Sequence, residues 1–209
     1  MSVVAQREAR RVIAFPKCGH TSVINTFMTT YGQSVQRGAV ANNSFKGLSE
    51  ETHSWPAAKV SIAVLRNPLT RLASAYNHLI LETQRENFLA LGFDQDMIFP
   101  EFCQHLGNID LTADNHLKPQ AVSLHEARSG LLHLVQLEQL AEQWPLIVRA
   151  FDLPCTTDVA EFNAHHYTVD FDHWSIAFVK EIYADDYKLW EKADVETRAQ
   201  VPPVDNQAL

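Results

Sequence analysis

The segment Ala14–Ser22 reads AFPKCGHTS and completes an apolar run, RVIAF, that begins at Arg11. The apolar run predicts a strand. The residues after it predict a helix, because one helical face collects Val23, Ile24, Phe27, Met28 and Tyr31. A proline, a lysine and a glycine stand between the two elements and favour a tight turn. Such a turn can hold an anion, because unpaired backbone N–H groups and the positive end of the helix dipole meet there.

The same order of elements returns further along the chain. Residues Lys59–Leu65, KVSIAVL, are nearly all apolar and rich in β-branched side chains, as in a strand that is buried on both faces. Arg66 follows the strand, and then Asn67 and Pro68 suit the N-cap and the first position of a helix over Pro68–Thr83. Both turns therefore lie at the end of a predicted strand.

The rest of the chain continues this alternation. We expect, in chain order, a mostly irregular segment at 32–59, a short helix at 99–107, a loop at 108–124, a strand at 130–137, a helix at 138–154 that Pro145 kinks or restarts, and an amphipathic helix at 175–192. Strands that alternate with helices predict an α/β fold with a central, mainly parallel sheet flanked by helices. Ligands of such sheets bind at the C-terminal ends of the strands, where both turns lie.

Length and composition limit the classes of protein to consider. The 209 residues suit one domain, which we assign to residues 1–200, followed by an irregular tail at 201–209. A net charge of −8 argues against nucleic acid as a partner. The charged N-terminal residues do not resemble a signal peptide, and no apolar run has the length of a membrane span. We therefore expect a cytoplasmic protein; the sequence predicts no oligomeric state.

The cysteines and the metal-ligand residue types give little sign of a disulfide or a metal. Three widely spaced cysteines, Cys18, Cys103 and Cys155, suit free thiols in a reducing compartment. No grouping of Cys, His or carboxylates has the spacing of a metal site, and we expect none. Cys18 has no basic partner nearby in sequence, so we interpret it as a small packing residue and not as a nucleophile.

The residues of the two turns suit phosphate recognition. Arg66 can bind a phosphate through its planar guanidinium, and Ser74, two turns into the next helix, can add a hydroxyl donor. Either residue alone also fits a structural role, as a salt bridge or as a small residue in helix packing. The first turn is not a triphosphatase loop of the form GxxxxGK[ST], because Lys17 precedes Gly19.

Together the two turns resemble the PAPS-dependent sulfotransferases, in particular the carbohydrate sulfotransferase (family-2) type. That family carries a 5′-phosphosulfate loop, PKxGxTS, and a 3′-phosphate motif, RxPxxRxxSAY. Here they read PKCGHTS (Pro16–Ser22) and LRNPLTRLASAY (Leu65–Tyr76). The likeness continues in DNHLKPQ (residues 114–120), in which Leu117 replaces a common tryptophan, in LVQLEQL (134–140) and in VKEIYADDYKLW (179–190). It therefore extends over nearly the whole chain and implies a three-layer, P-loop-like fold.

The resemblance also implies a donor and residue roles. The donor is 3′-phosphoadenosine 5′-phosphosulfate (PAPS), with adenosine 3′,5′-bisphosphate (PAP) as the product and no metal. Lys17 would contact the bridging oxygen or the sulfuryl group, and Arg66 and Ser74 would hold the 3′-phosphate. The whole expected nucleotide site comprises Pro16, Lys17, Cys18, Gly19, His20, Thr21, Ser22, Arg66 and Ser74. The implied acceptor is a hydroxyl of a carbohydrate or a glycosylated small molecule.

The general base is left open between several residues. His116 is the first candidate, because Asp114 two residues earlier can orient its imidazole. His53 is the second, because related enzymes often carry a catalytic His or Glu in the loop before the second strand. Glu50 and Glu51 are the alternatives in that loop. Further histidines have other expected roles, a loop contact or surface packing: His20, His165 and His166.

Two other functions remain as alternatives. One is a kinase-like phosphotransferase, which would need a lysine after the glycine and a Mg²⁺-binding acid at a strand end. The other is a nucleotide-binding protein without catalysis.

Overall fold

The computed structural model describes residues 2–5, 10–19, 21–23, 26, 60–82, 86–127, 131–150, 158–159 and 169–200. The expected irregular segment at 32–59 and the tail at 201–209 both lie outside these residues. No helix in the described part of the chain is both long enough and apolar enough to cross a membrane.

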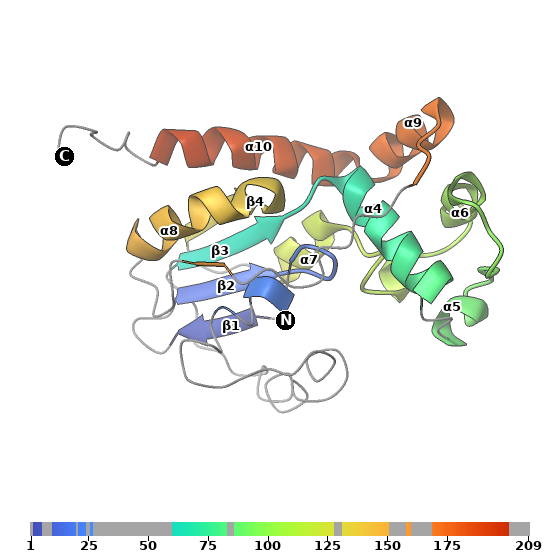
Figure 1. Ribbon diagram of the computed structural model, residues 1–209, viewed down its shortest axis with the longest axis horizontal. Coiled ribbons are helices and arrows are strands. Elements are labelled where there is room, and N and C mark those ends of the chain that lie inside the picture. The colour runs from blue at the N-terminus through green and yellow to red at the C-terminus, as the bar shows by residue number, and fades with distance from the viewer. Residues whose placement is uncertain are drawn as a thin grey trace.

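The described elements form one sheet with helices around it (Figure 1). The strands are β1 (Ser2–Ala5), β2 (Arg10–Ala14), β3 (Val60–Leu65) and β4 (Leu131–Gln136). The α-helices are α4 (Pro68–Tyr76), α5 (Glu86–Ala90), α6 (Phe99–Leu106), α7 (Gln120–Ala127), α8 (Leu140–Ala150), α9 (His173–Ile182) and α10 (Ala184–Gln200). Three short segments complete the set: the π-helical η2 (Asn77–Glu82) and the 3-10 turns η3 (Leu111–Ala113) and η4 (Leu137–Gln139).

The sheet has the order β1-β2-β3-β4. Strands β2, β3 and β4 are parallel, with Ala14 beside Val64 and Leu65 beside Gln136, and β1 pairs antiparallel to β2. The predicted P-loop-like α/β class, with a mainly parallel sheet flanked by helices, is confirmed. Because the parallel strands run side by side, the residues that follow β2 and β3 lie at the same edge of the sheet.

Both faces of the sheet are buried, which explains why its strands are so continuously apolar. Val12 and its neighbours on one face pack against Trp144 and the other apolar residues of α8. Ile13 and its neighbours on the opposite face pack against Leu124 of α7 and Ala193 of α10. Figure 1 shows α8 lying in front of the sheet and α10 running along β4.

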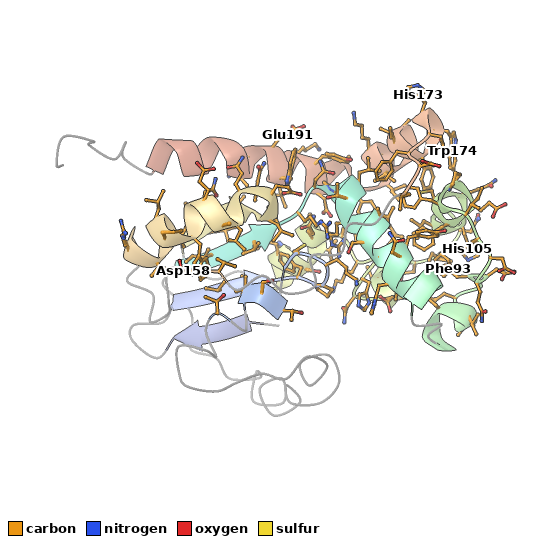
Figure 2. All side chains as sticks on the ribbon, in the orientation of Figure 1. Phe93, His105, Asp158, His173, Trp174 and Glu191 are labelled. Carbon is orange, nitrogen blue, oxygen red and sulfur yellow. The ribbon has the colours of Figure 1, made fainter. Side chains whose placement is uncertain are left out.

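A third apolar cluster joins α4, η2, α5, α6 and α9 beyond the end of the sheet. Aromatic rings fill it, including Tyr76 against Phe102 at a centroid distance of 5.3 Å. Figure 2 shows Phe93 and His105 at the outer side of this cluster, where their rings meet edge to face at 4.6 Å. This cluster anchors α4, the helix that follows the second turn.

Several expected elements differ from the structure. The helix expected at Pro68–Thr83 is α-helical only to Tyr76 and continues as the π-helical η2. Residues 108–124 are not wholly a loop, because α7 begins at Gln120. Pro145 does not restart the helix, which continues through it as α8.

The expected C-terminal helix is in fact two helices. Tyr183, with φ −112° and ψ 30°, leaves the helical conformation between α9 and α10. Its side chain is buried, and its hydroxyl donates to the carbonyl oxygen of Leu117 at 2.7 Å. Tyr183, at the junction of α9 and α10, therefore connects the C-terminal helices to the loop that carries His116.

Candidate functional site

The turn after β2 has two residues in the left-handed backbone region. Lys17 has φ +64° and Gly19 has φ +68°. The Cys18 N–H donates to the carbonyl oxygen of Phe15 at 3.0 Å, and the Val23 N–H donates to that of Gly19 at 3.0 Å. Residues 21–23 are helical, so the turn leads directly into a helix N-terminus as the sequence predicts.

A side chain at Gly19 would strain the backbone and displace the side chain of Leu137. A side chain at its φ is strained, and a Cβ there would lie 2.5 Å from Cδ1 of Leu137 in η4. Lys17 adopts a similar backbone conformation without the freedom of glycine, at a cost of roughly 1–2 kcal/mol. Strain of this kind persists where surrounding contacts impose it, and it gathers at functional sites.

One of those contacts comes from Arg66. Its Nη1 donates to the carbonyl oxygen of Lys17 at 3.0 Å, and its Nε donates to Oγ1 of Thr70 at 3.2 Å. Asn67 caps α4 as expected, because its side chain accepts hydrogen bonds from the first turn of that helix. The structure thus brings the expected 3′-phosphate arginine into contact with the expected 5′-phosphosulfate turn.

Ser74 lies on the buried side of α4, two turns after Arg66, with 8% of its surface exposed. In the described residues no hydrogen bond joins its side chain to Arg66. Whether the two share a ligand therefore stays a prediction.

The side chain of Gln120, the first residue of α7, forms hydrogen bonds with both turns. Its Oε1 accepts from the Arg66 N–H at 2.9 Å and from the Cys18 thiol at 3.0 Å. Its Nε2 donates to the carbonyl oxygen of Arg66 at 2.9 Å. The side chain is fully buried, so these hydrogen bonds are made without competition from water.

Asp186 of α10 holds Gln120 in place. Its two carboxylate oxygens accept from the backbone N–H groups of Gln120 and Ala121, each at 2.8 Å. Desolvation by burial raises the pKa of Asp186, while these hydrogen bonds and the charge of Arg71 act in the opposite direction. A carboxylate from α10 therefore caps the N-terminus of α7. This explains why the residues just before Gln120 include no N-cap signal for that helix.

The Cys18 thiol is completely buried beneath the turn. Burial raises its pKa to about 11, although the charges of Arg71 and Arg66 act to lower it. The thiol is therefore protonated near neutral pH and donates its hydrogen to Gln120. This environment suits a packing residue, because a nucleophilic cysteine needs an accessible thiolate.

His116 and Asp114 form a close pair. Oδ1 of Asp114 accepts from the His116 N–H at 2.7 Å and lies 2.8 Å from Nδ1 of the imidazole. A carboxylate can only accept, so this contact places a proton on Nδ1 and leaves the lone pair of the neutral ring on Nε2. The ring of His78, in η2, lies 5.5 Å from that of His116. This orientation would suit a general base, and that role of His116 stays a prediction.

Arg71 is the second arginine of the RxPxxRxxSAY match, but the sequence predicts no role for it. Only 2% of its surface is exposed, although it carries a guanidinium group. Its Nε donates to the carbonyl oxygen of Pro16 at 3.3 Å, and its Nη2 reaches those of Lys118 at 2.9 Å and Asn115 at 3.5 Å. A signal was present, because Arg71 falls on the buried helical face between Pro68 and Ala75.

The remaining expected residues divide into two sets. Pro16, Thr21 and Ser22 are half-buried parts of the turn and of the following helix. The other set lies outside the described residues and comprises His20, Glu50, Glu51, His53, His165 and His166. Among the described residues, no group of three or more His, Cys, Asp or Glu side chains is arranged to hold a metal ion.

Comparison with known proteins identifies a family whose sequence profile covers both turns. The sequence profile of the sulfotransferase family matches residues 12–193, which include both turns, the His116 loop and most of α10. No curated protein resembles the chain closely enough to count as a relative. The crystal structure of a sulfotransferase from Alicyclobacillus acidocaldarius is similar at a TM-score of 0.45 and 15% identity, over 90% of this chain and 96% of that one. Because the family profile matches most of its length, the chain belongs to the sulfotransferase family.

Proposed function

We propose that this sulfotransferase moves a sulfuryl group from PAPS to a hydroxyl of a carbohydrate or of a glycosylated small molecule. Family membership supports the reaction class. The observation that carries the choice of donor is the convergence of Arg66 on Lys17, at 3.0 Å from Nη1 to the carbonyl oxygen. It brings the guanidinium of Arg66 to the left-handed turn that carries Lys17, in a chain of net charge −8. Such an arrangement suits an anion with two charged groups.

The residues divide the binding of the nucleotide between them. The turn from Pro16 to Ser22 would hold the 5′-phosphosulfate through backbone and hydroxyl donors, and Arg66 and Ser74 would hold the 3′-phosphate. This division fits the buried support of the turn, because Gln120 fixes both Cys18 and the backbone of Arg66. Preorganised donors of this kind need little rearrangement when an anion binds.

Transfer would proceed as an in-line displacement. The bond from sulfur to the phosphate oxygen breaks as the acceptor oxygen bonds to sulfur, and the hydroxyl proton passes to Nε2 of His116. Lys17 stabilises the negative charge that develops on the leaving oxygen. Asp114 supports the charge that His116 acquires, since its carboxylate lies 2.8 Å from Nδ1. Positioning and charge stabilisation supply most of the catalysis in related phosphoryl transfers.

His53, with Glu50 and Glu51, remains the alternative source of the base. These residues lie outside the described part of the chain, so only a functional assay separates them from His116. The proposed reaction uses no metal, and a reducing, cytoplasmic location suits the two described cysteines, Cys18 and Cys103, which are free thiols.

Nucleotide binding tests the proposal against a kinase-like phosphotransferase. In titration calorimetry PAP should bind without Mg²⁺ and more tightly than 5′-AMP, and MgATP should bind more weakly than PAP. Preferential binding of MgATP, with transfer of phosphate, would establish the kinase alternative and remove the sulfotransfer proposal. Binding of PAP without any turnover of PAPS would establish the non-catalytic alternative.

A further inference from the structure

The buried guanidinium of Arg71 connects two segments that are far apart in the sequence. One is the turn after β2, reached through the carbonyl oxygen of Pro16 at 3.3 Å. The other is the loop 114–118, reached through the carbonyl oxygens of Lys118 at 2.9 Å and Asn115 at 3.5 Å. Pro16 directly precedes Lys17, and Asn115 directly precedes His116. Arg71 thus joins the backbones next to the proposed sulfuryl-binding lysine and the proposed base.

Stability alone is a poor explanation for this arrangement. In the described structure Arg71 forms no ion pair, although its charge acts on the buried carboxylate of Asp186, and all three of its hydrogen-bond acceptors are uncharged carbonyl groups. A buried charge without an ion-pair partner in contact costs free energy, and an apolar residue of similar size often serves a core equally well. Only arginine offers several donors in a rigid fork that can reach carbonyls of two separate segments.

The loop 114–118 is held together by hydrogen bonds of its own. The carbonyl oxygen of Asp114 accepts from the N–H groups of Leu117 at 3.0 Å and Lys118 at 2.8 Å. The side chain of Asp114 also binds the backbone and the ring of His116. The Tyr183 hydroxyl holds the loop from the far side through the carbonyl oxygen of Leu117. A contact at Lys118 or Asn115 therefore fixes the position of the His116 ring as well.

We propose that Arg71 is a positioning residue for sulfuryl transfer, which sets the place of His116 relative to the turn of Lys17. This inference rests on the proposed function. Arg71 need not touch the nucleotide or the acceptor, because it acts through the backbones of both segments. The coupling also runs in the other direction: a nucleotide that orders the turn orders the His116 loop through Arg71.

The test follows this coupling by hydrogen–deuterium exchange, with PAP as the probe. In the wild-type protein, saturating PAP should slow amide exchange in residues 15–23 and also in residues 114–118. In Arg71→Lys, which keeps the charge but loses the fork, PAP should still protect residues 15–23 and should no longer protect 114–118. Arg149→Lys makes the same change at an exposed position of α8 and should behave like the wild type.

Kinetics with labelled PAPS provide a second readout, which a purely structural role would not produce. Arg71→Lys should keep the KM for PAPS within about twofold and lower kcat by roughly 10²-fold, the loss that a misplacement of about 1 Å causes. In a His116→Ala background the same substitution should cost far less, because Arg71 then has no base to position. If Arg71→Lys does not fold, Arg71→Gln and the wild-type exchange experiment apply the same test.

The outcomes separate this inference from the proposed function. If PAP protects neither segment of the wild type, the proposed function fails and the inference fails with it. If PAP protects residues 15–23 but never 114–118, the function stands and the coupling through Arg71 is refuted. Equal protection of 114–118 in wild type and Arg71→Lys refutes it too, as do fully additive kinetic losses of Arg71→Lys and His116→Ala.

Discussion

Nη1 of Arg66 donates to the carbonyl oxygen of Lys17 at 3.0 Å, so the side chain proposed for the 3′-phosphate supports the residue proposed for sulfuryl transfer. This hydrogen bond would therefore link the residue that binds the 3′-phosphate to the residue that binds the sulfuryl group. Lys17 sits at φ +64°, a conformation that needs such support.

This relationship makes Arg66→Ala a test of both ends of the nucleotide site. The variant should bind PAP more weakly by about 1.5–3 kcal/mol, the value of a lost charge-assisted hydrogen bond. Its affinity for 5′-AMP should fall much less, because 5′-AMP has no 3′-phosphate. Titration calorimetry of both nucleotides gives the two numbers. Equal losses for PAP and 5′-AMP would remove Arg66 from the 3′-phosphate site and leave it a support of the turn.

Substitutions of Lys17 should separate activity from stability. Lys17→Ala should lower kcat by about 10²-fold or more if the ammonium stabilises the leaving oxygen. Lys17→Gly should be equally inactive, yet more stable than Lys17→Ala by about 1 kcal/mol, because only glycine adopts this φ without strain. Denaturant unfolding and steady-state kinetics of the pair measure both effects. A near-normal kcat with only a raised KM for PAPS would reduce Lys17 to an anchor for ground-state charge.

The base is tested by a pair of variants, His116→Ala and His53→Ala. We expect His116→Ala to lose turnover while it keeps PAP affinity and thermal stability, because among the described residues the ring hydrogen-bonds only to Asp114. The acidic limb of the pH–rate profile should disappear with the base. An active His116→Ala beside an inactive His53→Ala would transfer the role to His53. If both variants stay active, Glu50 and Glu51 become the candidates.

The buried Cys18 thiol predicts a loss of stability at alkaline pH. Burial raises its pKa from 9.0 to about 11, so between these values the folded chain keeps a proton that the unfolded chain has released. Stability that is fully present below pH 9 is therefore lost as the pH rises through that window. Cys18→Ser, whose hydroxyl can still donate to Gln120, should flatten this loss by at most about 1.4 kcal/mol per pH unit.

Unfolding in denaturant at pH 8, 9, 10 and 11 measures this effect. Cys103, whose pKa burial raises to about 12, should add an alkaline loss of its own, so Cys103→Ser and the double variant are measured beside Cys18→Ser to separate the two thiols. Native Cys18 should also resist alkylation by iodoacetamide at pH 8 until the protein is unfolded, as peptide mapping would show. Rapid alkylation in the folded state, or an unchanged alkaline slope in Cys18→Ser, would show that the thiol is accessible.

The local parts of the site could be predicted from the sequence because they depend on neighbouring residues. The strand β3, the cap at Asn67 and the turn around Gly19 all follow from apolar pattern and turn chemistry within a few positions. The supports of the site could not be predicted in this way. Gln120 meets Asp186 across 66 residues, and a helix whose N-terminus is capped from so far away resembles a loop in sequence.

Arg71 shows the same limit in a different form. Its place on an apolar helical face is visible in the sequence, but its three carbonyl partners are not. Backbone acceptors carry no residue signature, so no pattern marks the segments that a buried arginine will join. The break at Tyr183 is hidden for a related reason, because the apolar period continues through it while a distant carbonyl of Leu117 holds its hydroxyl.

The central claim, sulfuryl transfer from PAPS, is tested most directly by an assay with ³⁵S-labelled PAPS and a panel of glycosides and glycans, run without added metal. The account predicts that label moves to a hydroxyl of at least one acceptor, that PAP forms in equal amount, and that Lys17→Ala abolishes both. Binding of PAPS without transfer to any acceptor, or transfer that survives in Lys17→Ala, would contradict it.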